Sequence, residues 1–261
     1  MRSPSIGASL FSEEPDAQWT LPKRLREISG LAVTPDGRVM GHDDETAVIY
    51  QLDIDRGEVI KRFSLGDPVK RGDFEGIAID DDGAFYLTTS TGRVYCFREG
   101  DDRAHVAYES FDTGLRDIAE IEGLAYSRAE DSLILACKTI YAPDLQGMFA
   151  LFAWSPRTPG RLAEPWLVIP LAPFAEAVGA KAFHPSSLEI DARTGRLVVL
   201  AARQNAMVEL AADGTLLAAR RFGKGLRQAE GATIMPDGAL VVAREGGDAR
   251  ALMRRYARVH D

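Results

Sequence analysis

The chain has 261 residues, of which 46% are hydrophobic and 27% are charged, proportions typical of a soluble globular protein. Its longest apolar stretches are only as long as a strand, so the sequence contains no predicted membrane span. A formal net charge of −8 argues against nucleic acid or an anionic membrane surface as a partner.

The chain begins with a segment, Met1 to Ser12, that lacks the long apolar core and basic flank of a signal peptide. Two alternatives stay open: a cytoplasmic protein, or an exported one whose export segment has been removed. We expect residues 1–17 to form an N-terminal tail and residues 18–258 to form one domain, because repeat arrays run long as single units. The run from Gln18 to Leu21 is short and β-prone. We predict that it pairs with residues 254–257, because an edge strand left open invites aggregation.

One short phrase then returns five times along the chain. The copies are Ile28-Ser29-Gly30-Leu31, Phe74-Glu75-Gly76-Ile77, Ile121-Glu122-Gly123-Leu124, Ser186-Ser187-Leu188 and Ala229-Glu230-Gly231-Ala232. With Ser29, Glu75, Glu122, Ser187 and Glu230 as markers, the intervals are 46, 47, 65 and 43 residues. A period near this size, filled with strands and turns, is typical of a propeller blade of four antiparallel strands.

The second copy gives the clearest pattern of strands and turns. Predicted strands cover residues 75–79, 84–89, 93–97 and 105–111, and a turn at Asp82-Gly83 joins the first two. The 65-residue interval indicates one blade with enlarged loops, one of which carries a short helix over residues 174–181. We therefore predict an all-β fold, a propeller of five four-stranded blades closed by an N-terminal strand, with six blades as the alternative.

Three glutamates, Glu75, Glu122 and Glu230, occupy the same position of the repeat, so a ring of blades brings them near one axis. Converging carboxylates repel one another unless a cation lies between them, and calcium is the hard cation that prefers oxygen ligands. Further candidate oxygen ligands of this site are Ser29, Ser187 and Glu189.

Two other interpretations of these glutamates stay open. In the first, channel ion pairs form with the cations at the ends of second strands, Lys138, Arg203 and Arg244. In the second, the glutamates accept hydrogen bonds from backbone amides where the strands begin.

The densest polar cluster, Gly41 to Glu45, follows the second strand of the first blade. We consider His42 as a general base there, with Asp43 or Asp44 orienting it, and His184 as a second candidate on an enlarged loop. The alternative for the cluster is a solvated hairpin turn. No Gly-x-Ser-x-Gly elbow, His-Glu-x-x-His helix or phosphate loop is present, which excludes a serine hydrolase of the usual α/β type.

The Glu-Gly-(Ile/Leu)-Ala phrase, the hairpin turns and Gln228-Ala229-Glu230-Gly231 resemble the SdiA-regulated family of bacterial β-propellers. That family is similar to phytase-like, esterase-like and gluconolactonase-like propellers, and the match runs from about Arg26 to Arg255. The resemblance implies a propeller with calcium in its central channel, in an extracytoplasmic protein. The chain departs from the family after its second strands, at Cys137-Lys138, Arg203-Gln204 and Arg244-Glu245.

Two functions follow from these observations. The first is a binding module that holds calcium in the channel and takes up a small molecule or a protein at the channel mouth. The second is a calcium-dependent hydrolase of esters, lactones or phosphoesters, so the sequence leaves open whether the protein is an enzyme. We expect a monomer.

Overall fold

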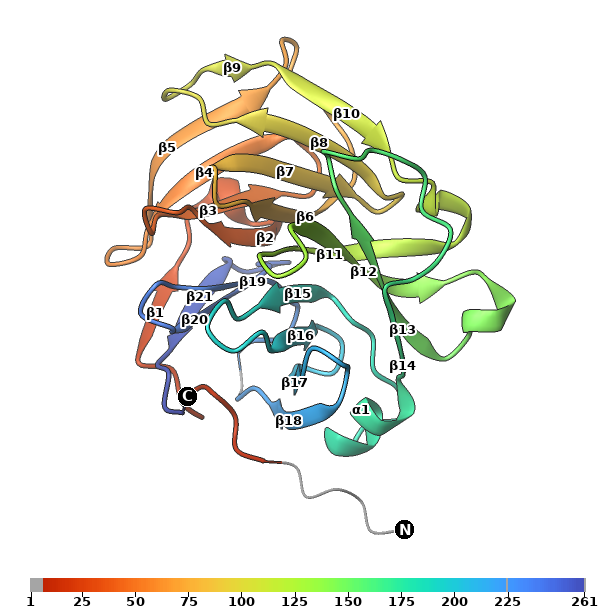
Figure 1. The fold of residues 1–261 in the computed structure, drawn as a ribbon. Helices are drawn as coiled ribbons and strands as arrows, with labels where there is room; N and C mark the ends of the chain where they lie inside the picture. The colour runs from red at the N-terminus through yellow and green to blue at the C-terminus, as the bar shows by residue number, and fades with distance from the viewer. Residues whose placement is uncertain (1–6, 224, 261) are drawn as a thin grey trace.

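The computed structural model describes residues 7–223 and 225–260, so the first half of the segment weighed as a signal peptide lies outside the described residues. Five sheets are arranged around a central channel, which confirms the predicted five-bladed propeller (Figure 1). No helix of the described residues has the length and apolar character needed to cross a membrane.

Each blade consists of four antiparallel strands that follow one another outward from the channel. Blade 1 contains β2 (Ile28–Val33), β3 (Val39–Asp43), β4 (Val48–Asp53) and β5 (Glu58–Leu65). Blade 2 contains β6 (Phe74–Ile79), β7 (Ala84–Thr89), β8 (Arg93–Arg98) and β10 (Tyr108–Asp112). Blade 3 contains β11 (Ala119–Ser127), β12 (Ser132–Ile140), β13 (Met148–Trp154) and β14 (Leu167–Pro170).

The remaining two blades come from the end of the chain and its beginning. Blade 4 contains β15 (Ser187–Ile190), β16 (Leu197–Ala201), β17 (Ala206–Leu210) and β18 (Leu216–Arg221). Blade 5 contains β19 (Ala229–Ile234), β20 (Leu240–Arg244), β21 (Leu252–Tyr256) and β1 (Ala17–Thr20). The helical segments of the described residues are α1 (Ala172–Ala177) and three short 3₁₀ turns at Lys23–Leu25, Leu115–Asp117 and Pro143–Leu145.

The N-terminal strand closes the ring, as the sequence predicts. Strand β1 pairs antiparallel with β21, so that Gln18 lies opposite Arg254 and Thr20 opposite Leu252 (Figure 1). The described residues ahead of β1 also pack onto the ring, because Leu10 and Phe11 are buried in the core between blades 4 and 5. The part of the expected tail from residue 7 onward therefore contributes to the core.

Two predicted elements differ from the structure at their boundaries. The predicted strand over residues 105–111 is divided, because β9 (His105–Val106) pairs in parallel with Ser64 and Leu65 of blade 1. This pairing lets Val106 pack against the core between blades 1 and 2, and only β10 completes blade 2. The predicted helix over residues 174–181 begins two residues earlier and ends at Ala177.

The core of the protein lies between neighbouring blades, and each of five apolar clusters combines residues of two adjacent blades. The inner strands approach one another most closely at the glycine of the repeated phrase. A Cβ at Gly76 would lie 2.8 Å from the backbone nitrogen of Leu124, and one at Gly123 would lie 2.8 Å from that of Leu188. Glycine is therefore required at these two positions for the blades to converge.

Candidate functional site

The first polar residue of the phrase is bulged out of the strand pairing in four blades. The register shifts across Ser29, Glu75, Glu122 and Glu230, so each is left unpaired between two paired neighbours. A β-bulge re-aims the extra side chain, and here it directs the side chains to the end of the channel where the inner strands begin.

Eight carboxyl groups interact electrostatically at this end of the channel, and we call them the acidic mouth. They are Glu27, Asp44, Asp73, Glu75, Glu120, Glu122, Glu230 and Glu245. The structure thus brings together the three glutamates that share a position in the repeat. Their side chains influence one another although they come from blades 2, 3 and 5.

The acidic mouth favours protonated carboxyls. Burial, followed by the neighbouring Glu122, raises the pKa of Glu75 to about 9. Burial, followed by Glu245, raises the pKa of Glu230 to about 9. A side-chain hydrogen bond joins Glu230 to Glu245 and raises the pKa of Glu230, so protonated Glu230 is the donor. Without a cation, burial and the neighbouring carboxyls therefore favour the protonated forms of Glu75 and Glu230.

Of the three cations expected in the channel, one pairs with a glutamate of the mouth. Lys138 forms an ion pair with Glu122, and its Nζ lies 3.7 Å from the carboxylate of Glu120. Arg244 instead donates to the backbone oxygen of Glu245 at 3.0 Å. The strand register explains the difference. Arg244 pairs with Ala229 as Cys137 pairs with Ile121, so the residue equivalent to Lys138 is Glu245 and not Arg244.

Arg203, the third of these cations, is exposed at the rim of the mouth. It lies near His184, because Arg203 and Lys138 both lower the pKa of that histidine, after the larger effect of burial. No ion pair joins Arg203 to a carboxylate of the described residues.

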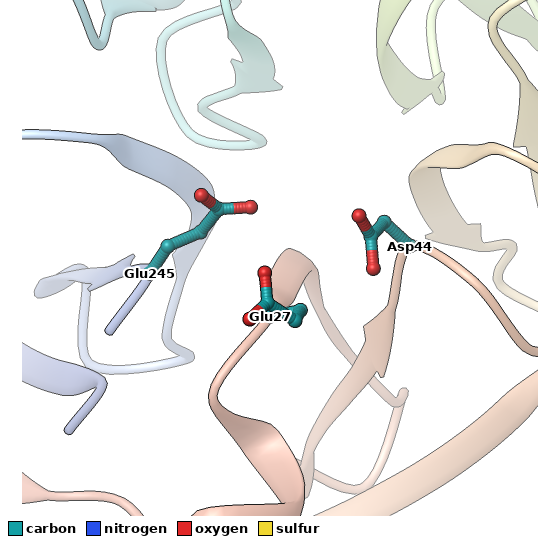
Figure 2. A group of neighbouring side chains, drawn as sticks. All are labelled: Glu27, Asp44 and Glu245. Atoms are coloured by element: carbon teal, nitrogen blue, oxygen red, sulfur yellow. The ribbon is translucent and has the colours of Figure 1, made fainter. Parts of the chain in front are cut away.

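Three carboxylates of the mouth come closest to the geometry of a metal site. One oxygen each of Glu27, Asp44 and Glu245 lies within 4.8 Å of the others. Glu27 precedes β2, Asp44 follows β3 and Glu245 follows β20, and their side chains point toward one another (Figure 2). Calcium–oxygen distances of about 2.3–2.6 Å place two ligand oxygens on opposite sides of one ion about 5 Å apart, so a single calcium ion fits this spacing.

The surroundings of Asp44 suit a positively charged ligand. Its Oδ1 is buried and accepts no hydrogen bond from any described residue. Burial, followed by Glu245 and Glu27, raises the pKa of Asp44 to about 6. Glu27 has an exposed partner of its own, Arg26, at 2.8 Å. An all-oxygen donor set with an orphaned carboxylate oxygen suits a hard cation.

The remaining predicted ligands are two serines of the repeated phrase, Ser29 and Ser187, and Glu189. Ser29 is buried at the bulge of blade 1. Ser187 pairs with Leu200 and precedes Leu188 as Gly30 precedes Leu31, so the residue of blade 4 that corresponds to the glutamates is Ser186. The hydroxyl of Ser186 donates to the oxygen of Ala229 and accepts from the nitrogen of Ala202, both at 3.0 Å.

Glu189 belongs to the opposite end of the channel. It stands three residues beyond Ser186 along the inner strand, which is about 10 Å at a rise of about 3.3 Å per residue. Burial raises its pKa to about 7, and its Oε1 accepts from the nitrogen of Ile190 at 2.8 Å. Glu189 and Thr233 line a separate cavity of about 460 Å³ at that end.

The two candidate histidines occupy different environments. His42 is completely buried, which lowers its pKa to about 4, and its Nδ1 lies 2.9 Å from the backbone oxygen of Asp43. The alternative of a solvated turn is therefore wrong for His42. The carboxylate of Asp43 accepts from Thr46 rather than from the histidine. His184 is only partly buried and lies at the acidic mouth beside Arg203 and Lys138.

A second ring of mouth residues was not anticipated from the sequence. They stand two positions ahead of Ser29, Glu75, Glu122, Ser186 and Glu230, and they are Glu27, Asp73, Glu120, His184 and Gln228. The signal is present in the sequence, because three of the five are acidic. When the fourth copy is aligned on Ser186 instead of Ser187, the ring also includes His184.

No protein-family model matches the sequence, and no curated protein matches it. Solved structures with a similar fold include glutaminyl cyclase of Myxococcus xanthus, with 14% identity over 94% of this chain and 97% of that chain and a TM-score of 0.61. The PQQ-bound aldose sugar dehydrogenase of Streptomyces coelicolor has 14% identity over 93% and 99%, with a TM-score of 0.55. A streptogramin B lyase has 11% identity over 92% and 97%, with a TM-score of 0.51. At these identities the similarity shows the β-propeller fold.

Proposed function

We propose that this protein is a binding module of the SdiA-regulated type that holds calcium at the acidic mouth and takes up a ligand there. The observation that carries the proposal is the trio of Glu27, Asp44 and Glu245, whose oxygens lie within 4.8 Å of one another and include the orphaned Oδ1 of Asp44. The resemblance of the repeated phrase to that family supports the choice of calcium.

The balance of charge at the mouth supports a bound cation over a pure network of ion pairs. Lys138 neutralises one carboxylate on the blade 3 side, at Glu122. On the side of blades 1 and 5, neither Asp44 nor Glu245 forms an ion pair with any described residue. Partly buried carboxylates that repel one another and have no counter-charge are costly, so a divalent cation would stabilise this side of the ring.

Calcium titration of chelator-treated protein tests the proposal. We expect calorimetric binding and a rise in melting temperature, since a ligand at 100 times its Kd stabilises the folded state by about 2.7 kcal/mol. The double variant Asp44→Asn/Glu245→Gln should lose both responses. The control Glu189→Gln, which alters a carboxyl at the opposite end of the channel, should keep them. The proposal is contradicted if millimolar calcium gives no calorimetric binding and no rise in melting temperature with the wild type. It is also contradicted if the double variant shows both responses as the wild type does.

A second function, the hydrolysis of esters, lactones or phosphoesters, is favoured by the proton-transfer groups of the mouth. A neutral His184 accepts a proton from an attacking water, and a protonated carboxyl such as Glu75 returns one to the leaving oxygen. Calcium, when bound, polarises a carbonyl or phosphoryl oxygen. The similar structures are by name a cyclase, a dehydrogenase and a lyase, so the fold does not select a reaction.

A panel of lactone, aryl-ester and phosphoester substrates, assayed with calcium and with chelator, separates the two functions. Hydrolysis requires turnover that needs calcium and falls at least about 100-fold in His184→Gln, the low end of the usual contribution of a general base. If no substrate is turned over while calcium still binds, hydrolysis is excluded for these substrate classes and the binding function is supported.

A further inference from the structure

A second charged feature lies beside the acidic mouth, in the loops of blade 4 and the connection to blade 5. It is a cleft of about 1040 Å³ whose lining includes four cationic side chains, and we call it the basic cleft. The four are Lys181, Arg203, Arg221 and Arg227. Side-chain amides of Gln204, Asn205 and Gln228 complete its polar lining.

The positive charge of the basic cleft has no internal counter-charge. No carboxylate lines the cleft, and none of its four cations forms an ion pair with a carboxylate of residues 7–223 or 225–260. Other arginines of this chain are paired, as Arg38 is with Glu99 and Arg258 with Asp191. Four unpaired cations around one hollow, in a chain of net charge −8, concentrate a positive potential there.

The wall of the cleft is held in place by hydrogen bonds. The Nε of Arg221 donates to the oxygen of Val178 at 2.7 Å, and its Nη2 donates to the oxygen of Gly179 at 3.1 Å. These bonds fix a guanidinium at the end of β18 next to the cleft. A planar guanidinium matches the geometry of carboxylate and phosphate oxygens.

The cleft and the acidic mouth adjoin each other. Arg203 of the cleft acts electrostatically on His184, on which Lys138 of the mouth also acts. The side chain of Gln204 accepts from the backbone nitrogen of His184 at 3.1 Å. Gln228 lines the cleft and also occupies the ring position that Glu27 and Glu120 hold in other blades. One molecule at the mouth therefore meets negative charge on one side and positive charge on the other.

We propose that the basic cleft is an oxyanion subsite, and that the ligand of this protein is a small zwitterion with its oxyanion in the cleft and its ammonium group at the acidic mouth. This proposal rests on the proposed function in one respect: both assume that the acidic mouth binds a positively charged group. A polyanion such as nucleic acid does not fit, because the carboxyl groups of the mouth repel its continuing chain. A simple anion uses the cleft alone and gains nothing from the mouth.

The test compares bifunctional and monofunctional probes by calorimetry at low salt with chelator-treated protein, in which no calcium competes with the ammonium group for the carboxylates of the mouth. The bifunctional probes are 4-aminobutyrate, 6-aminohexanoate and 8-aminooctanoate, which vary the separation of the two charges, and the monofunctional probes are hexylamine and hexanoate. We expect at least one bifunctional probe to bind 10-fold or more tightly than either monofunctional probe. Equal affinities for all five compounds would overturn the proposal.

Variants locate the binding. Arg203→Gln/Arg227→Gln removes two exposed charges of the cleft and should reduce the affinity of the best bifunctional probe to that of hexylamine. The control Arg56→Gln/Arg103→Gln removes two exposed charges elsewhere and should bind like wild type. Equal loss in both variants would refute the subsite. The variant Arg203→Gln/Arg227→Gln should still bind calcium like the wild type. Its loss of probe affinity then tests the cleft alone and is independent of the calcium site.

Discussion

Replacing Glu75 with glutamine should change how the stability of the calcium-free protein depends on pH. Burial and the neighbouring Glu122 raise the pKa of Glu75 to about 9 in the folded state, whereas an unfolded glutamate titrates near 4.5. Between these values the folded protein holds a proton that the unfolded chain has released. Stability from this group is therefore full below about pH 4.5 and is lost as the pH rises toward 9.

The slope sets the size of the effect. One group that is protonated when folded and ionised when unfolded contributes about −1.4 kcal/mol per pH unit to the free energy of unfolding. Glutamine resembles the protonated carboxyl and does not titrate. As the pH rises from 5 to 8, the free energy of unfolding of Glu75→Gln should increase by about 2–4 kcal/mol relative to that of the wild type. The lower part of this range applies if Glu75 shares its proton with Glu122.

Urea unfolding of chelator-treated protein at pH 5, 6, 7 and 8 measures this difference directly. The control is Glu109→Gln, which alters an exposed residue of β10 and should track the wild type at every pH. Added calcium should reduce the slope of the wild type, because a cation stabilises the ionised mouth. A constant difference between Glu75→Gln and the wild type from pH 5 to pH 8 would refute the assignment of Glu75 to a crowded acidic mouth.

Two further predictions concern the ring itself. Gly76→Ala places a Cβ 2.8 Å from the backbone nitrogen of Leu124, so we expect a loss of about 1–3 kcal/mol and a melting temperature lower by about 2–10 °C. Gly160→Ala, whose Cβ would meet nothing within 4 Å, should melt like the wild type, and equal melting of both variants would contradict a tight hub. Deletion of residues 1–22 removes β1 and exposes the edge of β21, so we expect a lower melting temperature and concentration-dependent light scattering. An unchanged melting temperature in that truncation would show that β1 does not close the ring.

The architecture was predictable because its signals are local and repeated. The Glu-Gly phrase and turns such as Asp82-Gly83 recur at blade spacing, and each marks a strand boundary without knowledge of the rest of the chain. The division of residues 105–111 between two blades was not predictable in this way. It depends on Val106 meeting the side of blade 1, which is a contact across the molecule.

The candidate site was predictable only in part, because the direction of a side chain depends on the strand frame to within one residue. The proximity of Glu75, Glu122 and Glu230 was predictable because they share one position of the repeat. Equivalent positions have equivalent surroundings in every blade, even when the direction of their side chains is not known. Arg244 was chosen over Glu245 because the sequence does not reveal the bulge that sets the frame at the end of β20. The burial of His42 is equally hidden in the sequence, since a polar residue next to the end of β3 lies in the part of that strand, Val39 to His42, that is buried.

The pairing of β1 with β21 also orders events during synthesis. The ribosome releases β1 before any complete blade and releases β21 after the strands of the other four blades, so the two partners meet last. Until then blade 5 lacks an outer strand, and the nascent chain carries four blades that have no final neighbour. The ring is thus completed in a single late step. Before that step, unpaired strand edges of the growing protein are open to pairing with other chains, unless chaperones or rapid folding prevent it.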